Sequence, residues 1–314
     1  RGGLMPLPIV PANSAAESGN DNGLFGYGYV QSPASWLSVS NKVANTGVVA
    51  TDTTGVGTGR RELAACEYGG DKAIFAYGGP GPGTYTDLSN LVSNTGVVAT
   101  DTTGVGQDRS MLAACEYGGD KGIFGYGFNS PAAPPGFMAM TNLVSNTGVI
   151  GTDVTGVGDD RRMLAACEYG DDKGIFGYGS SPSNTATTNL VSNTGVVATD
   201  TTGVGTARSM LAACSFGGDQ GIFGYGYPPW AGLSMTNIVS NTGVVATDTT
   251  GVGQTRTMLA ACEYGGDKGV FGYGQSPEHT ELSMTNLVSN TGVVATDTTG
   301  VGTSRSMLAG CSYN

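Results

Sequence analysis

Two oppositely charged residue types recur at fixed positions along this chain, and they are the first candidates for chemistry. Six arginines each stand just before an apolar run, at Arg60, Arg109, Arg161, Arg208, Arg256 and Arg305. Six aspartates stand shortly before them, at Asp52, Asp101, Asp153, Asp200, Asp248 and Asp297. The matched numbers predict Arg–Asp pairs that join each unit of the chain to the next. An arginine ring that grips an anion at a channel mouth is the alternative.

Catalytic motifs are absent from the sequence. His279 is the one histidine, so a copper oxidase site with paired histidines has no ligands. The chain has no Gly-x-Ser-x-Gly elbow, phosphate loop or Cys-x-x-Cys pair. We therefore expect no enzyme activity, no cofactor and no metal. Glu278 and Glu281 leave open the alternative of an enzyme whose site lies on variable loops.

The six cysteines occur once per repeat, at Cys66, Cys115, Cys167, Cys214, Cys262 and Cys311. Equivalent positions on face-packed sheets lie about 10 Å apart, whereas a disulfide needs Cα atoms within about 7 Å. Thiolate metal sites use closely spaced pairs. The spacing predicts six buried free thiols.

The composition indicates an all-β protein that does not bind polyanions. Charged residues make up 12% of the 314 residues, glycine is abundant with 54 copies, and the net charge is −11. A negative surface disfavours nucleic acid and anionic lipid, and no apolar run approaches the roughly 20 residues of a membrane span. Because the chain begins at Arg1 rather than Met, we expect it to be a processed product.

A repeat of about 50 residues must position these side chains. The repeat that starts at Ser110 reads SMLAACEYGGDKGIFGYG, then a variable stretch, then TNLVSNTGVIGTDVTGVG. We expect four strands in it, at residues 111–117, 122–127, 142–144 and 149–153. Alternation in the second strand predicts that Phe124 and Tyr126 share one face, where they pack over the glycines of a neighbouring sheet.

The two ends of the chain predict how the units are arranged. Residues 21–60 supply strands two to four of a unit, and residues 305–314 supply a lone first strand. Joined, they complete one unit, as in a ring that removes its open edges. We predict an all-β, six-bladed β-propeller of four-stranded antiparallel blades, closed by the C-terminal strand. The expected blades are residues 21–60 plus 305–314, 61–109, 110–161, 162–208, 209–256 and 257–304.

The repeat resembles that of kelch-type β-propellers. The likeness lies in the arginine before the first strand, the Gly-Gly-Asp turn at residues 69–71 and 118–120, and the Ile-Phe-Gly-Tyr-Gly strand. The phrases GIFGYG and SNTGVVATDTTGVGTAR are also similar to repeats in virion and tail-fibre proteins of aquatic bacteriophages. These resemblances imply a six-bladed fold and a place on a virion or an extracellular surface.

The loops between strands two and three carry most of the variation between units. They hold both tryptophans and the histidine, and their prolines lower the cost of ordering on binding. Exposed aromatic side chains commonly anchor sugar or protein ligands. The candidate binding residues are Trp36, Tyr85, Phe128, Phe137, Tyr227, Trp230 and His279, together with the six arginines. Neutral surface loops are the alternative interpretation.

These observations predict a non-enzymatic structural or recognition module that binds a protein partner or a surface glycan. A soluble multivalent lectin is the second hypothesis. We expect residues 1–20 to form an extended arm or linker, in which the apolar, proline-rich segment from Leu4 to Val10 docks on a neighbouring subunit. A disordered tail or the remnant of a preceding domain is the alternative.

Overall fold

A computed structural model describes residues 21–130, 136–228 and 232–314 of the protein. This part of the chain is all-β, with 18 strands in six three-stranded antiparallel sheets and a two-residue hairpin. In the described ranges no helix is long and apolar enough to cross a membrane. The expected docking arm from Leu4 to Val10 and the candidate Trp230 lie outside the described residues.

Each sheet is built from one repeat. The sheet that contains both chain ends has the order β2 (Ala34–Val43), β1 (Asn22–Gln31), β20 (Ala309–Tyr313). Two sheets follow, β3 (Ala64–Tyr68), β4 (Lys72–Ala76), β5 (Ser89–Val92) and β6 (Ala113–Tyr117), β7 (Lys121–Phe128), β8 (Phe137–Val144). The fourth sheet consists of β9 (Ala165–Tyr169), β10 (Lys173–Gly177) and β13 (Thr188–Val191), with the hairpin β11 (Ser180–Ser181) and β12 (Ser183–Asn184) between the last two. The remaining sheets are β14 (Ala212–Phe216), β15 (Gln220–Gly224), β16 (Thr236–Val239) and β17 (Ala260–Tyr264), β18 (Lys268–Gly272), β19 (Thr285–Val288).

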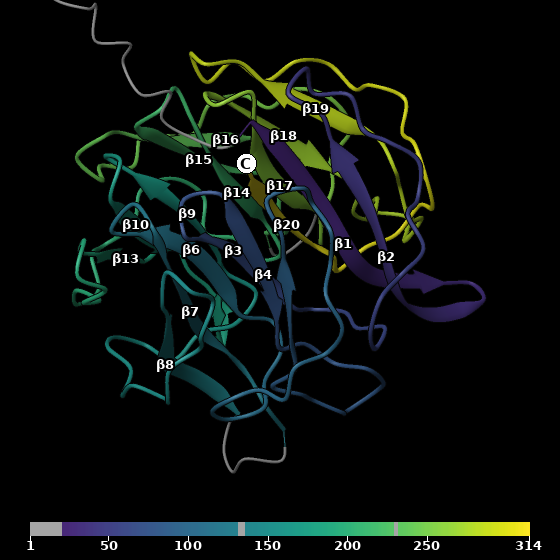
Figure 1. Ribbon diagram of the computed structural model, residues 1–314. Coiled ribbons are helices and arrows are strands. Elements are labelled where there is room, and N and C mark those ends of the chain that lie inside the picture. The colour runs from purple at the N-terminus through teal and green to yellow at the C-terminus, as the bar shows by residue number, and fades with distance from the viewer. Residues whose placement is uncertain (1–20, 131–135, 229–231) are drawn as a thin grey trace, which may run out of the picture.

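The first strand of each repeat lies toward the middle of the molecule, and the third strand lies outside (Figure 1). Strand pairing stays within each sheet. The sheets meet face to face instead. The strands in contact are β3 with β6, β6 with β9, β9 with β14, β14 with β17, β17 with β20, and β20 with β3.

Backbone hydrogen bonds between turns follow the same order. The Gly118 amide donates to the Asp172 carbonyl of the next sheet at 2.8 Å, and Gly170 repeats this contact with Asp219. At the chain ends, Asn314 donates to the Asp71 carbonyl at 3.0 Å. Each turn is therefore fixed by the sheet beside it.

The C-terminal strand completes the sheet that the N-terminal residues begin. β20 pairs antiparallel with β1, and Leu24 lies opposite Cys311 in that register. This pairing confirms the part of the prediction that the two ends of the chain complete one unit. It joins two segments that lie almost a full chain length apart in the sequence.

The prediction of a fourth strand is wrong. The segment expected at residues 149–153 forms isolated bridges only, at Val144–Ile150 and Thr141–Val154. Sheets in the described part of the chain therefore have three strands each.

A buried asparagine explains why the fourth segment does not pair continuously. The Asn142 side-chain amide donates to the Gly151 carbonyl at 3.0 Å and to Asp153 Oδ1 at 2.9 Å. These bonds occupy groups that a regular ladder would use for backbone pairing. The same contacts recur in the other units, for instance from Asn41 to Ala50 and Asp52.

Small residues let adjacent sheets pack closely. A Cβ atom added at Gly125 would lie 2.7 Å from the ring of Phe176, and one added at Gly122 would lie 2.4 Å from Cys66 Sγ. All six cysteines are free and buried, as predicted, and burial raises the pKa of the Cys66 thiol. The prediction of aromatic rings over glycines is thus confirmed for the phenylalanine.

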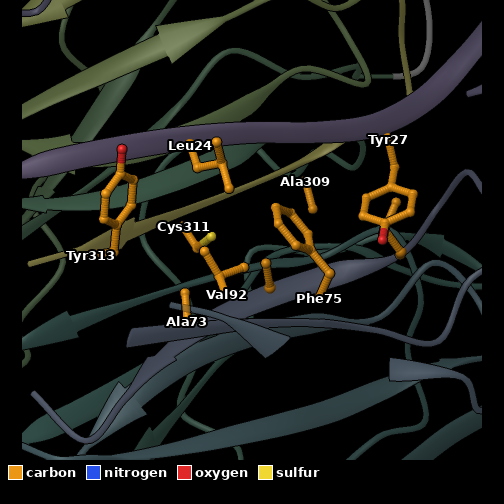
Figure 2. Packing of buried hydrophobic residues seen from close by; sticks show 10 residues of the cluster. Leu24, Tyr27, Ala73, Phe75, Val92, Ala309, Cys311 and Tyr313 are labelled. Carbon is orange, nitrogen blue, oxygen red and sulfur yellow. The ribbon is translucent and has the colours of Figure 1, made fainter. Parts of the chain in front are cut away.

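In β4, Ala73 stands at the position that Gly122 occupies in β7. Figure 2 shows the contact between that sheet and the sheet of the chain ends, where Cys311 and Leu24 lie near Ala73, and Phe75 lies beside Ala309. The adjacent sheets can therefore accommodate a methyl group at this position.

The expected shared face of Phe124 and Tyr126 is wrong. Phe124 packs with Tyr77 of the preceding sheet, whereas Tyr126 packs with Phe176 of the following one. The register of β7 and β8 shifts between Gly125 and Gly127, and Tyr126 has a φ of 65°. This bulge reverses the alternation of side chains, so one strand contributes an aromatic ring to both of its neighbours.

The adjacency of the chain ends gives a direct test of the fold. The Asp21 amide lies 3.4 Å from the Asn314 carbonyl oxygen. We expect a permuted chain that begins at Arg305, joins Asn314 through one glycine to Asp21 and ends at Ser304 to fold with little loss of stability.

Deletion of residues 305–314 is the contrasting variant. It removes Cys311 and Tyr313 from a buried cluster, so we expect a loss of more than about 3 kcal/mol, the cost of one large core side chain. Urea denaturation and gel filtration measure both changes. Equal stability of the truncated and full-length chains would contradict the described pairing of β20 with β1.

Candidate functional site

The six repeated arginines are structural. Each is buried with 0% of its surface exposed, although all six were candidates for binding. The set is Arg60, Arg109, Arg161, Arg208, Arg256 and Arg305. Because their guanidinium groups do not reach the surface, the alternative of an arginine ring that grips an anion at a channel mouth is wrong.

Each arginine joins two sheets. The Arg109 Nη2 donates to Asn142 Oδ1 of its own sheet at 2.6 Å. On its other side, the guanidinium carbon lies 4.1 Å from the ring centroid of Tyr77, which belongs to the preceding sheet. The hydroxyl of Tyr77 in turn donates to the Val105 carbonyl at 3.2 Å. A desolvated cation over an aromatic face is worth about 2 kcal/mol or more.

The expected Arg–Asp pairs exist, but at the outer limit of an ion pair. Three of them are found in the described residues at a separation of 3.9 Å: Arg109–Asp153, Arg208–Asp248 and Arg305–Asp52.

The aspartates themselves make the link to the neighbouring unit. Asp52 accepts from the Thr303 amide at 3.0 Å and from its hydroxyl at 2.6 Å. Burial opposes ionisation of Asp52, but the hydrogen bonds from Thr303 and Asn41 outweigh it and lower the pKa of this carboxyl.

Three of the candidate aromatic residues lie together on the side of the molecule that carries the variable loops, called here the loop face. Phe128 lies 6.2 Å from Tyr85 and 5.7 Å from Phe137, measured between ring centroids. The guanidinium of Arg162 lies 4.7 Å from the Phe128 ring and 5.0 Å from the Phe137 ring. These four residues, which come from three consecutive sheets, form the first aromatic cluster.

Trp36 belongs to a second aromatic cluster on the loop face. Its ring lies 5.3 Å from Tyr29, and Arg61 stacks on Tyr29 at 4.9 Å and on Trp36 at 5.9 Å. The Trp36 indole nitrogen is buried and has no hydrogen-bond partner among the described residues.

The remaining described candidates are not part of either cluster. Tyr227 is 39% exposed and His279 is also exposed. Neither has an aromatic partner in the described part of the chain. Sequence analysis thus found the aromatic residues but missed Arg61 and Arg162, which organise them.

A ring of backbone hydrogen bonds connects six residues that lie just before the first strands of the sheets. Each amide donates to the carbonyl of the preceding member at 2.8–2.9 Å, and Glu62 donates to Met307. All six residues have a φ between 55° and 57°. The members are Glu62, Met111, Met163, Met210, Met258 and Met307. With the adjacent leucines they line an apolar pocket of about 90 Å³.

Glu62 breaks the symmetry of this methionine ring. Its carboxylate accepts from Ser110 Oγ at 3.1 Å and lies 3.7 Å from Arg61 Nε. Burial raises the pKa of Glu62, while Arg61, Ser110 and Arg162 oppose the shift. Glu62 is therefore the one polar member of the ring. Its carboxylate is influenced by Arg61 of the second aromatic cluster and by Arg162 of the first.

A second, polar cavity of about 310 Å³ lies among the first strands of the six sheets. Four glutamates of the first strands line it: Glu67, Glu116, Glu168 and Glu263. Ser215 and Ser312 occupy the equivalent positions of the other two sheets. No group of three or more His, Cys, Asp or Glu residues in the described part is placed to hold a metal ion.

The glutamates hold their protons more tightly than glutamate in water. Burial, followed by the charges of Glu67 and the nearby aspartates, raises the pKa of Glu168 to about 8. Burial and the carboxylates of Glu168 and Glu67 likewise raise the pKa of Glu116. Glu67 alone has a described partner, the Ser312 amide at 2.5 Å.

Sequence analysis missed this cavity. The signal was present in the run Ala-Ala-Cys-Glu-Tyr, which places a glutamate at the same position of the first strand in four repeats. The apolar residues around this glutamate predict a buried strand and conceal the polar position within it.

Comparison with known proteins adds no family. No protein-family model matches the chain, and no curated protein matches it either.

The buried arginines predict a large difference between two arginine substitutions. Arg109→Met leaves Asn142 and Asp153 without a cationic partner, so we expect a loss of about 3–5 kcal/mol. Arg162→Ser places at a loop-face position the residue that Ser110, Ser209 and Ser306 supply in other repeats, and we expect a loss below about 1 kcal/mol. Urea denaturation of both variants measures the difference. If both variants lose a similar amount of unfolding free energy, the prediction that the buried Arg109 matters more for stability than Arg162 is wrong.

The glutamate cavity predicts that stability falls as the pH rises. A carboxyl whose pKa is raised in the folded state stabilises the protein fully below its unfolded pKa of about 4.3, and this contribution is lost as the pH rises through the folded value. For Glu168 the loss continues to about pH 8. We expect the melting temperature to decrease between pH 5 and pH 8.5, by about 2–4 °C for each kcal/mol.

Glu168→Ser is the matched variant, since Ser215 occupies the same position in β14. Calorimetry across this pH range should give a flatter curve for the variant. A wild-type melting temperature that rises from pH 5 to pH 8.5 would contradict the prediction.

Proposed function

We propose that the chain forms a closed six-bladed propeller, similar to those of the kelch type, and acts as a non-enzymatic recognition module on a virion or extracellular surface. The face-to-face contacts of the six sheets, which run from β3 through β20 and back to β3, support the closed ring. The hydrogen bonds of the methionine ring run in the same cycle. A phage particle or fibre is the setting that the resemblance of the repeats suggests.

The loop face is the recognition surface in this proposal. The residue after the buried arginine is Arg61, Ser110, Arg162, Ser209, Thr257 and Ser306 in the six repeats. In the part of the chain that the structure describes, the two arginines alone among these residues stack on loop aromatics, Arg61 on Trp36 and Arg162 on Phe128. The six repeats therefore present unequal surfaces, which disfavours a lectin with six equivalent sites.

One observation carries the proposal: Arg162 stacks on both Phe128 and Phe137, at 4.7 and 5.0 Å from their ring centroids. Stacking fixes the rings before a ligand arrives, which lowers the entropy lost on binding. Aromatic rings and arginine are also the residue types that contribute most to protein interfaces. The site therefore suits a protein surface or a glycan with an apolar face.

Binding of a glycan array and of candidate surface proteins tests this function. We expect one binding site per chain and a loss of affinity of about tenfold or more for Arg162→Ser, equal to about 1.4 kcal/mol. His279→Ala alters an exposed loop residue outside both clusters and should bind like the wild type. Six sites per chain, or equal affinity of the Arg162→Ser protein, would contradict the proposal.

A further inference from the structure

The acidic cavity among the first strands is separate from the loop face. Its lining includes Gly70, Gly119 and Gly218, which belong to the turns that follow the first strands. Toward the loop face, the buried leucines and the methionine ring line the other pocket. A ligand would thus reach the glutamates from the turn side, away from the proposed recognition surface.

Three carboxyl groups in this cavity have no partner. Glu116, Glu168 and Glu263 line the cavity and are partly buried. Their side chains have no hydrogen bond or ion pair in the described residues, whereas Glu67 accepts from the Ser312 amide. Unpaired carboxyl groups away from bulk water are costly, because the charged form loses its hydration.

The wall supplies acids and no cation. Besides the four glutamates, Asp171 lines the cavity, and the other lining residues are glycine, alanine, serine and cysteine. Asp171 has a φ of 64°, at a turn position where other repeats have glycine. The nearby lysines, such as Lys121 and Lys173, are paired with the turn aspartates Asp120 and Asp172.

We propose that this cavity binds an organic polycation, a linear polyamine with two or more ammonium groups, at the carboxylates of Glu116, Glu168 and Glu263. Each bound ammonium group donates hydrogen bonds to a carboxylate, and a glutamate that was protonated releases its proton to solvent. No covalent bond changes.

A polyamine fits the geometry better than a metal ion. The described acidic residues are not grouped closely enough to coordinate one metal. They are instead spread around the wall of a cavity of about 310 Å³, on β6, β9 and β17. A flexible chain with separated charges can reach several of them at once, and a hydrogen bond to a charged group is stronger than one between neutral groups.

Protons compete with the ligand for the same oxygens. The titratable groups that face Glu168 are Glu67, Glu116, Glu263 and Asp171 in the cavity wall, with Asp172 in the adjacent turn. All of them are acidic, so the affinity for a polycation should rise with pH.

Calorimetric titration with spermidine tests the proposal on the full chain. We expect binding at pH 8, affinity at least tenfold weaker at pH 5.5, and proton release that differs between buffers of different ionisation enthalpy. Binding that is independent of pH and releases no proton would overturn the proposal. This measurement uses wild-type protein, so it does not depend on whether a variant folds.

A pair of matched variants locates the site. Glu116→Ser/Glu168→Ser introduces the residue that Ser215 and Ser312 supply at equivalent positions, and we expect at least a tenfold loss of spermidine affinity. Glu278→Ser/Glu281→Ser removes two carboxylates from a variable loop and should retain affinity. Equal losses in both variants would show non-specific attraction to a negative protein, and tighter binding of Mg²⁺ than of spermidine would also overturn the proposal.

Discussion

The rest of the structure depends on a buried arginine that holds two sheets together in every repeat. Arg109 illustrates the contact, with Asn142 of its own sheet on one side and the ring of Tyr77 from the preceding sheet on the other. Asn142 in turn binds Asp153, which fixes the irregular outer segment. Removing a buried charge from such a network is costly because its partners stay behind unpaired. The repeated charges are therefore a condition of the fold.

Much of the fold could be predicted because the relevant signals are repeated and local. The unit length, the free cysteines and the pairing of β20 with β1 all follow from the order of residues in the repeat. The missing fourth strand could not be predicted, because the Asn142 side chain competes with the backbone for the Gly151 carbonyl and no local pattern marks that competition. Tyr126 was misplaced for a similar reason, since a bulge reverses its side.

The candidate sites were less predictable than the fold. Aromatic loop residues such as Phe128 stand out in the sequence. The role of Arg162 becomes visible only in the structure, because it depends on a contact between two different sheets. The six repeated arginines suggested a binding role, but they are completely buried and pack between sheets instead. Glu168 was overlooked because its role depends on a cavity lined by residues of six different strands, which a single repeat does not reveal.

The repeats are nearly identical, but the contact between β1 and β20 differs from the other strand pairings in its sequence separation. In the other five sheets the strands that pair come from one short stretch of chain, so each of these sheets can assemble locally. Among the six sheets, only β1 and β20 must pair across nearly the whole length of the polypeptide. Loop closure over such a separation carries the largest entropy cost and slows folding. This strand pairing is consequently the step at which a second chain, at high concentration, competes to exchange its own C-terminal strand.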